Sequence, residues 1–113
     1  MAKTISIIDD DLAILDVVTL LLQDEGYNVL AYSKPSEFLK EFREKAPDAV
    51  LLDNTIGATS GKDLAEEVKK HLSIPVLMIS ASADVISHPC IDEFIKKPFT
   101  IDLLLDRVKK HLK

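Results

Sequence analysis

The stretch Ile7-Ile8-Asp9-Asp10-Asp11 places three carboxylates directly after a short apolar run near the N-terminus. A second apolar run, Val50-Leu51-Leu52, leads into Asp53 in the same way. Both patterns put carboxylates at the carboxyl ends of strands, the edge that holds the ligand crevice in an open parallel α/β sheet. Because carboxylates gathered there repel one another, we expect a hard divalent cation bound through oxygen to neutralise them. Lys97-Pro98 follows a third apolar run and adds a fixed positive charge, which completes a pattern typical of phosphoryl-transfer sites.

Length and composition predict a single domain, residues 1–113, with one core. The chain has 113 residues, of which 47% are hydrophobic, and a formal net charge of -5 that argues against contact with nucleic acid or anionic membrane. No apolar run is long enough to span a bilayer, and the N-terminus lacks the form of a signal peptide. The single cysteine, Cys90, cannot form an internal disulfide. We therefore expect a cytoplasmic protein.

Strand-like and helical patterns alternate along the chain, which predicts a parallel sheet with right-handed crossovers. The first expected strand ends at Ile8. Four more are expected over residues 27–32, 49–52, 75–79 and 90–95. Three helices are expected over residues 12–25, 35–45 and 62–72. A last helix is expected after Thr100, which would be its N-cap. Gly26 is expected to end the first helix, and residues 53–60 to form a loop. The stretch after Ser80 is too short for a full helix, and Pro89 disfavours helical geometry before it.

Four motifs, each after an apolar strand, occur in a specific order: Asp9-Asp10, Asp53 with Gly61 downstream, Ser80-Ala81, and Lys97-Pro98-Phe99. Over its whole length the chain resembles the receiver domain of bacterial two-component response regulators, such as the stand-alone chemotaxis regulators. The resemblance implies a flavodoxin-like, doubly wound α/β fold with five parallel strands in the order 2-1-3-4-5. Because the segment from Ser80 to Lys97 is shorter than usual in that family, we expect the fourth helix to be shortened or missing.

The resemblance also implies a role for individual residues. Asp53 would accept a phosphoryl group from a histidine kinase or phosphotransfer protein and form an acyl phosphate. Asp9 and Asp10 would help to hold Mg²⁺, with Asp10 the more direct ligand, and the backbone carbonyl of Thr55 would complete the protein's share of the coordination.

Three further positions match the parts of the family that respond to phosphorylation. Lys97 would pair with a phosphoryl oxygen, Ser80 would hydrogen-bond another, and Phe94 falls at the aromatic switch position. Ser80 stands for the commoner threonine and keeps its hydroxyl. Ile56-Gly57 replaces the usual Met-Pro or similar pair, and the glycine is expected to loosen the loop.

Taken singly, each of these residues also has an ordinary structural interpretation. Asp10 or Asp11 is a good N-cap for the first helix, and Asp11 is expected to serve mainly in that way. Asp53 is also a common turn residue. Ser80 can be a polar strand end, Phe94 a core residue and Lys97 part of a solvated pair.

The combined pattern predicts a Mg²⁺-dependent phosphoacceptor that does not act as an enzyme on an external metabolite. Its expected partners are a histidine kinase or phosphotransfer protein and a downstream protein. The alternatives are a degenerate receiver that binds proteins without phosphate and a flavodoxin-like small-molecule binder. A mobile loop over residues 81–89, ordered by phosphorylation, is expected beside exposed apolar surface at Phe94 and Cys90 that favours a partner or a weak homodimer.

Overall fold

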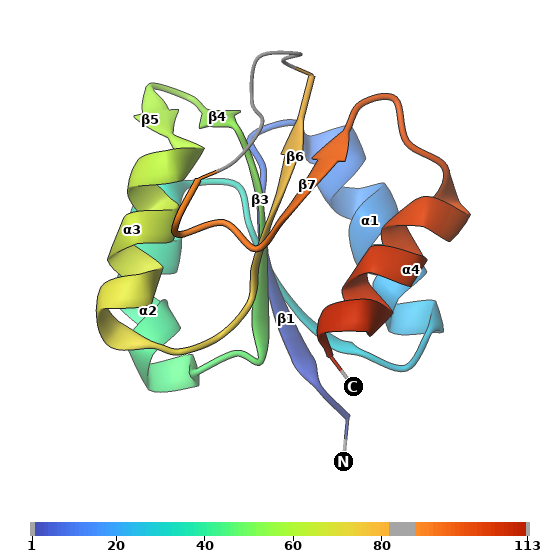
Figure 1. The fold of residues 1–113 in the computed structure, drawn as a ribbon, viewed down its shortest axis with the longest axis horizontal. Helices are drawn as coiled ribbons and strands as arrows, with labels where there is room; N and C mark the ends of the chain where they lie inside the picture. The colour runs from blue at the N-terminus through green and yellow to red at the C-terminus, as the bar shows by residue number, and fades with distance from the viewer. Residues whose placement is uncertain (1, 82–87, 113) are drawn as a thin grey trace.

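Five short runs rich in isoleucine, valine and leucine form one parallel sheet (Figure 1). The computed structural model describes residues 2–81 and 88–112. The strands are β1 (Thr4–Ile8), β2 (Asn28–Tyr32), β3 (Ala49–Asp53), β6 (Val76–Ser80) and β7 (Glu93–Lys96). Their order is β2-β1-β3-β6-β7 and every neighbouring pair is parallel, which confirms the predicted doubly wound topology.

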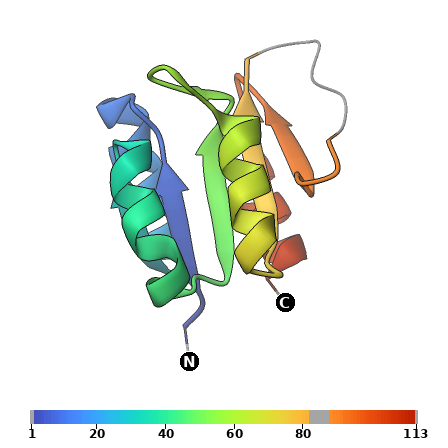
Figure 2. The ribbon, with the colours of Figure 1, turned by 90° about the vertical axis from the view of Figure 1, so that its left-hand side faces the viewer.

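Helices cover both faces of the sheet. They are α1 (Leu12–Asp24), α2 (Pro35–Lys45), α3 (Gly61–His71) and α4 (Ile101–His111). The pair α1 and α4 lies on one face and the pair α2 and α3 on the other (Figures 1 and 2). No helix in the described residues has the length and apolar character needed to cross a bilayer.

The central strands are buried on both faces, so successive side chains contribute to different halves of the core. Val50 and Leu52 belong to the cluster under α2 and α3, whereas Leu51 belongs to the cluster under α1 and α4. All three side chains are at most 1% exposed. This two-sided burial explains why β3 is apolar throughout until Asp53, instead of alternating apolar and polar residues.

The predicted helix ends are confirmed by their contacts. The side chain of Asp11 caps α1 by accepting hydrogen bonds from the N–H groups of Ala13 and Ile14. Gly26 follows α1 with a φ of 94°, a left-handed conformation that glycine adopts without steric cost. Thr100 caps α4 through the N–H of Leu103.

Two stretches differ from the predicted elements by more than one residue. Residues 53–60 contain a small antiparallel hairpin, β4 (Thr55–Ile56) and β5 (Thr59–Ser60), where the sequence predicted only a loop. The last strand begins at Glu93 instead of Cys90, because His88 and Ile91 form an isolated bridge across a turn. The Asp92 carboxylate accepts hydrogen bonds from the N–H of Val76 and from Lys69, which ties the entry of β7 to the start of β6.

The connection between β6 and β7 contains no helix in its described residues, 81 and 88–92. Too few residues are left for a helix of ordinary length, in agreement with the predicted shortening of the fourth crossover helix. The predicted mobility of residues 81–89 falls largely on residues 82–87, outside the described chain, and stays a prediction. The predicted apolar exposure at Phe94 and Cys90 is wrong, since both side chains are half-buried against the core cluster under α2 and α3.

We expect Phe38→Ala to destabilise the protein strongly. Phe38 is fully buried, lies edge-on to Tyr32 with ring centroids 5.7 Å apart, and stacks on Phe42 at 5.1 Å. Truncation should lower the free energy of unfolding by about 3–5 kcal/mol, measured by urea titration. The control Leu20→Ala, at a side chain 65% exposed, should change it by less than about 0.5 kcal/mol. Equal effects of the two substitutions would contradict this account of the core.

Candidate functional site

Three carboxylates meet at the carboxyl edge of the sheet. Asp9 and Asp10 follow β1, Asp53 ends β3, and these two strands are hydrogen-bonded neighbours. One oxygen from each of the three carboxylates lies within 4.8 Å of the others. Asp9 is buried, Asp53 is half-buried and Asp10 is exposed. The predicted acidic cluster is therefore formed, with an open side at Asp10.

Asp9 carries its charge in an unfavourable environment. Burial raises the pKa of its carboxyl, and the nearby charge of Asp53 raises it further. The N–H of Asp11 opposes this shift by donating a hydrogen bond of 2.9 Å to Asp9 Oδ1. The ionised cluster therefore opposes folding and favours a bound cation.

Asp53 is held between a main-chain donor and a lysine. Its Oδ1 accepts a hydrogen bond of 2.7 Å from the N–H of Asn54, and its Oδ2 lies 3.4 Å from Lys97 Nζ. Lys97 follows β7 and reaches across β6, and its own N–H donates to the carbonyl of Ser80 at 2.9 Å. The two side chains are 24% and 15% exposed, so water screens this ion pair only in part.

The start of α3 lies unusually close to the end of β3. The Gly61 N–H donates a hydrogen bond of 2.8 Å to the Asn54 carbonyl. A Cβ at residue 61 would clash with the Asp53 carbonyl oxygen and would lie 2.8 Å from Met78 Cε. Only glycine permits this approach, so Gly61 belongs to the structure that supports Asp53.

The remaining predicted residues occupy the same edge or lie next to it. Ser80 ends β6 and is 3% exposed, and its neighbour Ile79 pairs with Asp53 in the sheet register. Phe94 lies on β7, two residues before the end of that strand, and pairs with Met78 of β6. Its side chain is half-buried. The switch role assigned to these side chains stays a prediction.

The Thr55 carbonyl is placed by the hairpin. The Gly61 N–H to Asn54 carbonyl bond makes those residues a hydrogen-bonded pair. In an antiparallel ladder the next pair, Thr55 with Ser60, is then a non-hydrogen-bonded pair. The Thr55 carbonyl is therefore not used in the ladder of this hairpin, and its role as a metal ligand stays a prediction.

The sequence did not predict the main-chain donors to the three carboxylates, and one of them comes from a distant segment of the chain. Gly57 has a φ of 62° and its N–H donates a hydrogen bond of 2.9 Å to Asp10 Oδ2. The structure places Gly57 in the turn of the hairpin, and the expectation that it loosens the loop stays a prediction. The available signal was a Gly-X pair between β-branched residues, Ile56 and Thr59, which is typical of a two-residue hairpin turn.

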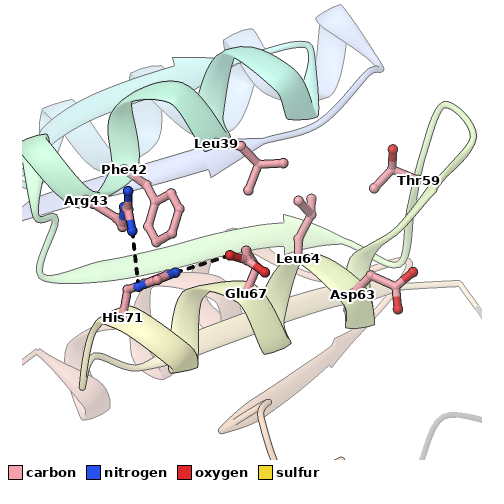
Figure 3. Close-up of a pocket in the computed structure, with 8 residues that line it drawn as sticks. All are labelled: Leu39, Phe42, Arg43, Thr59, Asp63, Leu64, Glu67 and His71. Atoms are coloured by element: carbon pink, nitrogen blue, oxygen red, sulfur yellow. Dashed lines mark hydrogen bonds and ion pairs between the residues drawn. The ribbon is translucent and has the colours of Figure 1, made fainter.

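A pocket of about 430 Å³ lies away from the carboxylates, in the groove between α2 and α3 (Figure 3). Leu39, Phe42 and Leu64 give it an apolar floor. At its rim, Arg43 Nη1 lies 3.4 Å from His71 Nδ1, and His71 Nε2 lies 3.2 Å from Glu67 Oε2. None of the clustered aspartates lines this pocket, so we place the candidate site at the sheet edge.

The chain matches the family model of the response regulator receiver domain over residues 5–109. It therefore belongs to the response regulator receiver domain family of two-component signalling proteins.

Solved structures of receiver domains share the fold. The response regulator TrrA from Thermotoga maritima, in complex with Mg(2+)-BeF, is 31% identical, with a TM-score of 0.86 over 96% of this chain and 97% of that chain. A receiver domain protein from Clostridium thermocellum is 28% identical, with a TM-score of 0.90 over 99% and 94% of the two chains. A putative response regulator from Chloroflexus aurantiacus is also 28% identical, with a TM-score of 0.89 over 99% and 98%.

We expect Asp9→Asn to stabilise the metal-free protein at neutral pH. The folded-state pKa of Asp9 lies above its ordinary value of 3.8, so the unfolded chain loses this proton first as the pH rises. Folding therefore becomes less favourable through that interval, and the penalty is fully present above the folded-state pKa. Asparagine removes the charge and keeps an oxygen to accept the Asp11 N–H.

The measurement is urea unfolding of parent and variant in EDTA between pH 4 and pH 8. The stability gain of Asp9→Asn should be largest near neutral pH and should shrink as the pH falls. The matched control is Asp24→Asn, at an exposed aspartate at the opposite end of α1, with an expected change below about 0.5 kcal/mol. A loss of stability in Asp9→Asn at pH 7 would argue against the assigned charge penalty.

Proposed function

We propose that this receiver domain is a phosphoacceptor and that the Asp53 carboxylate takes a phosphoryl group from a phosphohistidine of a partner protein. The observation that carries the proposal is the surroundings of Asp53 at the crevice edge: Asn54 N–H on one oxygen, Lys97 facing the other, and Asp9 and Asp10 within reach of a shared cation. These are the parts that position and stabilise a transferring phosphoryl group.

The transfer is a displacement at phosphorus. An Asp53 carboxylate oxygen forms a bond to phosphorus while the bond from phosphorus to the histidine nitrogen breaks. The electron pair of the broken bond stays on the imidazole nitrogen, and the product is an aspartyl phosphate. The Asn54 N–H keeps hold of one Asp53 oxygen, which leaves the Oδ2 that faces Lys97 as the nucleophile.

The donor set at the edge fits Mg²⁺. Carboxylate and carbonyl oxygens are the ligands that this hard cation prefers, and burial together with the charge of Asp53 raises the pKa of Asp9 even with Lys97 nearby. Asp10 and Asp53, assisted by Asp9 and the Thr55 carbonyl, would hold the ion. When bound, Mg²⁺ supplies positive charge beside the phosphoryl oxygens. The Mg(2+)-BeF complex of the TrrA receiver supports this assignment.

Lys97, Ser80 and Phe94 would convert phosphorylation into a change of surface. Lys97 exchanges its contact with Asp53 for a phosphoryl oxygen, and the Ser80 hydroxyl donates to another. Ser80 shares its register position with Lys96 on β7, the strand that carries Phe94. A shift of Ser80 can therefore reach Phe94 through the neighbouring strand. The phosphodonor would be a histidine kinase or phosphotransfer protein, and a downstream protein would recognise the changed surface.

We expect Asp53→Ala to abolish phosphorylation without unfolding the domain. Substitution removes a repelling charge at the crevice and opens no buried cavity. Incubation with phosphoramidate and Mg²⁺, followed by intact mass spectrometry, should add one phosphoryl group to the parent and none to the variant. The control Asp24→Ala should be labelled like the parent, and EDTA should suppress labelling of both. Full labelling of Asp53→Ala would refute the assignment of the acceptor.

We expect Lys97→Ala to interrupt the response to a phosphoryl mimic while changing the free energy of unfolding by about 1 kcal/mol or less. Beryllofluoride with Mg²⁺ should shift the amide NMR signals of Ser80 and Phe94 in the parent, and these shifts should be lost in the variant. Lys96→Ala is a matched control, because Lys96 is the adjacent lysine and is exposed. If Lys97→Ala showed the parent's shifts at Phe94, Lys97 would have no part in the switch.

A further inference from the structure

We propose that the main-chain N–H of Gly57 is a positioning group for Asp10, and that Mg²⁺ affinity depends on this hydrogen bond. The proposal deepens the proposed function and rests on it, because it concerns how the metal site is held together before the metal binds. The contact is a hydrogen bond of 2.9 Å from Gly57 N–H to Asp10 Oδ2, between residues 47 positions apart in the sequence.

Each of the three clustered carboxylates accepts one main-chain N–H, but the donors differ in origin. Asp9 is held by Asp11 and Asp53 by Asn54, so both of these donors come from the same loop as their acceptor. The donor for Asp10 belongs to the hairpin after β3. Among the described residues of the cluster, only Asp10 is therefore positioned by a different segment of the chain.

Asp10 needs such a donor more than the other two carboxylates. It is exposed, whereas Asp9 is buried, and repulsion from Asp9 and Asp53 favours its rotation out toward water. A hydrogen bond to a charged carboxylate is about twice as strong as one between neutral groups. The Gly57 N–H therefore opposes this rotation and keeps an Asp10 oxygen within reach of the shared cation.

The hairpin is built to present this N–H. Ile56 and Thr59 pair across a two-residue turn, and Gly57, the first of the two turn residues, has a φ of 62°. A positive φ at that position alone is the pattern of a type II′ turn, in which glycine is preferred. The N–H of this first turn residue is outside the ladder, so it can donate to Asp10. Ile56 is 0% exposed and anchors the hairpin in the core.

Metal binding and the order of the hairpin are consequently coupled. Mg²⁺ gains from a carboxylate that is already in place, and by linkage the hairpin gains from the bound metal by the same factor. The coupling passes through a single amide proton, which can be removed without changing any side chain of the site.

The test uses two proteins made by chemical synthesis, Gly57→D-Pro and Gly57→D-Ala. Both D-residues accept a positive φ, but only D-proline lacks the N–H. Isothermal titration calorimetry with MgCl₂ should show that Gly57→D-Pro binds Mg²⁺ at least about tenfold more weakly than the parent. This is the size expected for loss of a hydrogen bond to a charged group. Gly57→D-Ala should stay within about twofold of the parent. Equal affinities of the two variants, or tighter binding by Gly57→D-Pro, would overturn the proposal.

A second measurement needs only the parent protein. Coordination withdraws charge from Asp10, so the amide proton signal of Gly57 should move during Mg²⁺ titration in NMR. Gly26 is the control, since it also has a positive φ but follows the opposite end of α1. A Gly57 signal that stays still while Mg²⁺ binds contradicts the proposal alone. Absence of any Mg²⁺ binding to the parent contradicts the metal assignment of the proposed function as well.

Discussion

Repulsion among three carboxylates at one edge of the sheet is the constraint on which the rest of this site depends. The strand order places β1 beside β3, so Asp9, Asp10 and Asp53 cannot avoid one another. The protein offsets the cost with small contributions from several elements. Three main-chain N–H groups and the Lys97 ammonium each approach one carboxylate, and burial of Asp9 keeps part of the cost in place. That residual repulsion makes the edge receptive to a cation, and a bound cation would in turn offset the negative charge of a phosphoryl group.

The fold tolerates this edge because its stability comes from elsewhere. Val50, Leu51 and Leu52 are buried between two helical layers, and the aspartate follows only where the strand leaves them. The same apolar strand therefore fixes both the core and the position of Asp53. This separation is common in parallel α/β proteins, in which sheet interiors provide rigidity and strand ends carry the chemistry.

Elements of ordinary length and the helix caps were predictable from the sequence, whereas the two-residue strands and the contacts between distant segments were not. The alternation of strands and helices and the cap at Asp11 followed from apolar runs and the residues that end them, whereas the strand order and the role of Lys97 followed from the resemblance to receiver domains. Each strand of the β4–β5 hairpin has two residues, which is too few for a periodic pattern. The sequence therefore predicted a loop there. The late start of β7 depends on contacts of Asp92 with Val76 and Lys69, which no local pattern shows.

The Ile56-Gly57 pair shows why a departure from a family pattern needs a structural interpretation. From residue type alone, glycine at position 57 predicts a more flexible loop after Asp53. Read in the structure, it supplies a positive φ and an N–H directed at Asp10. A proline at residue 57 could provide neither, because its ring holds φ near −65° and its nitrogen carries no proton. Compared with the family pattern, the chain therefore has a hydrogen bond from the hairpin to Asp10 where proline would hold the backbone. The Asp10 carboxylate therefore belongs both to the hydrogen bonding of the hairpin and to the acidic cluster that we propose as the metal site.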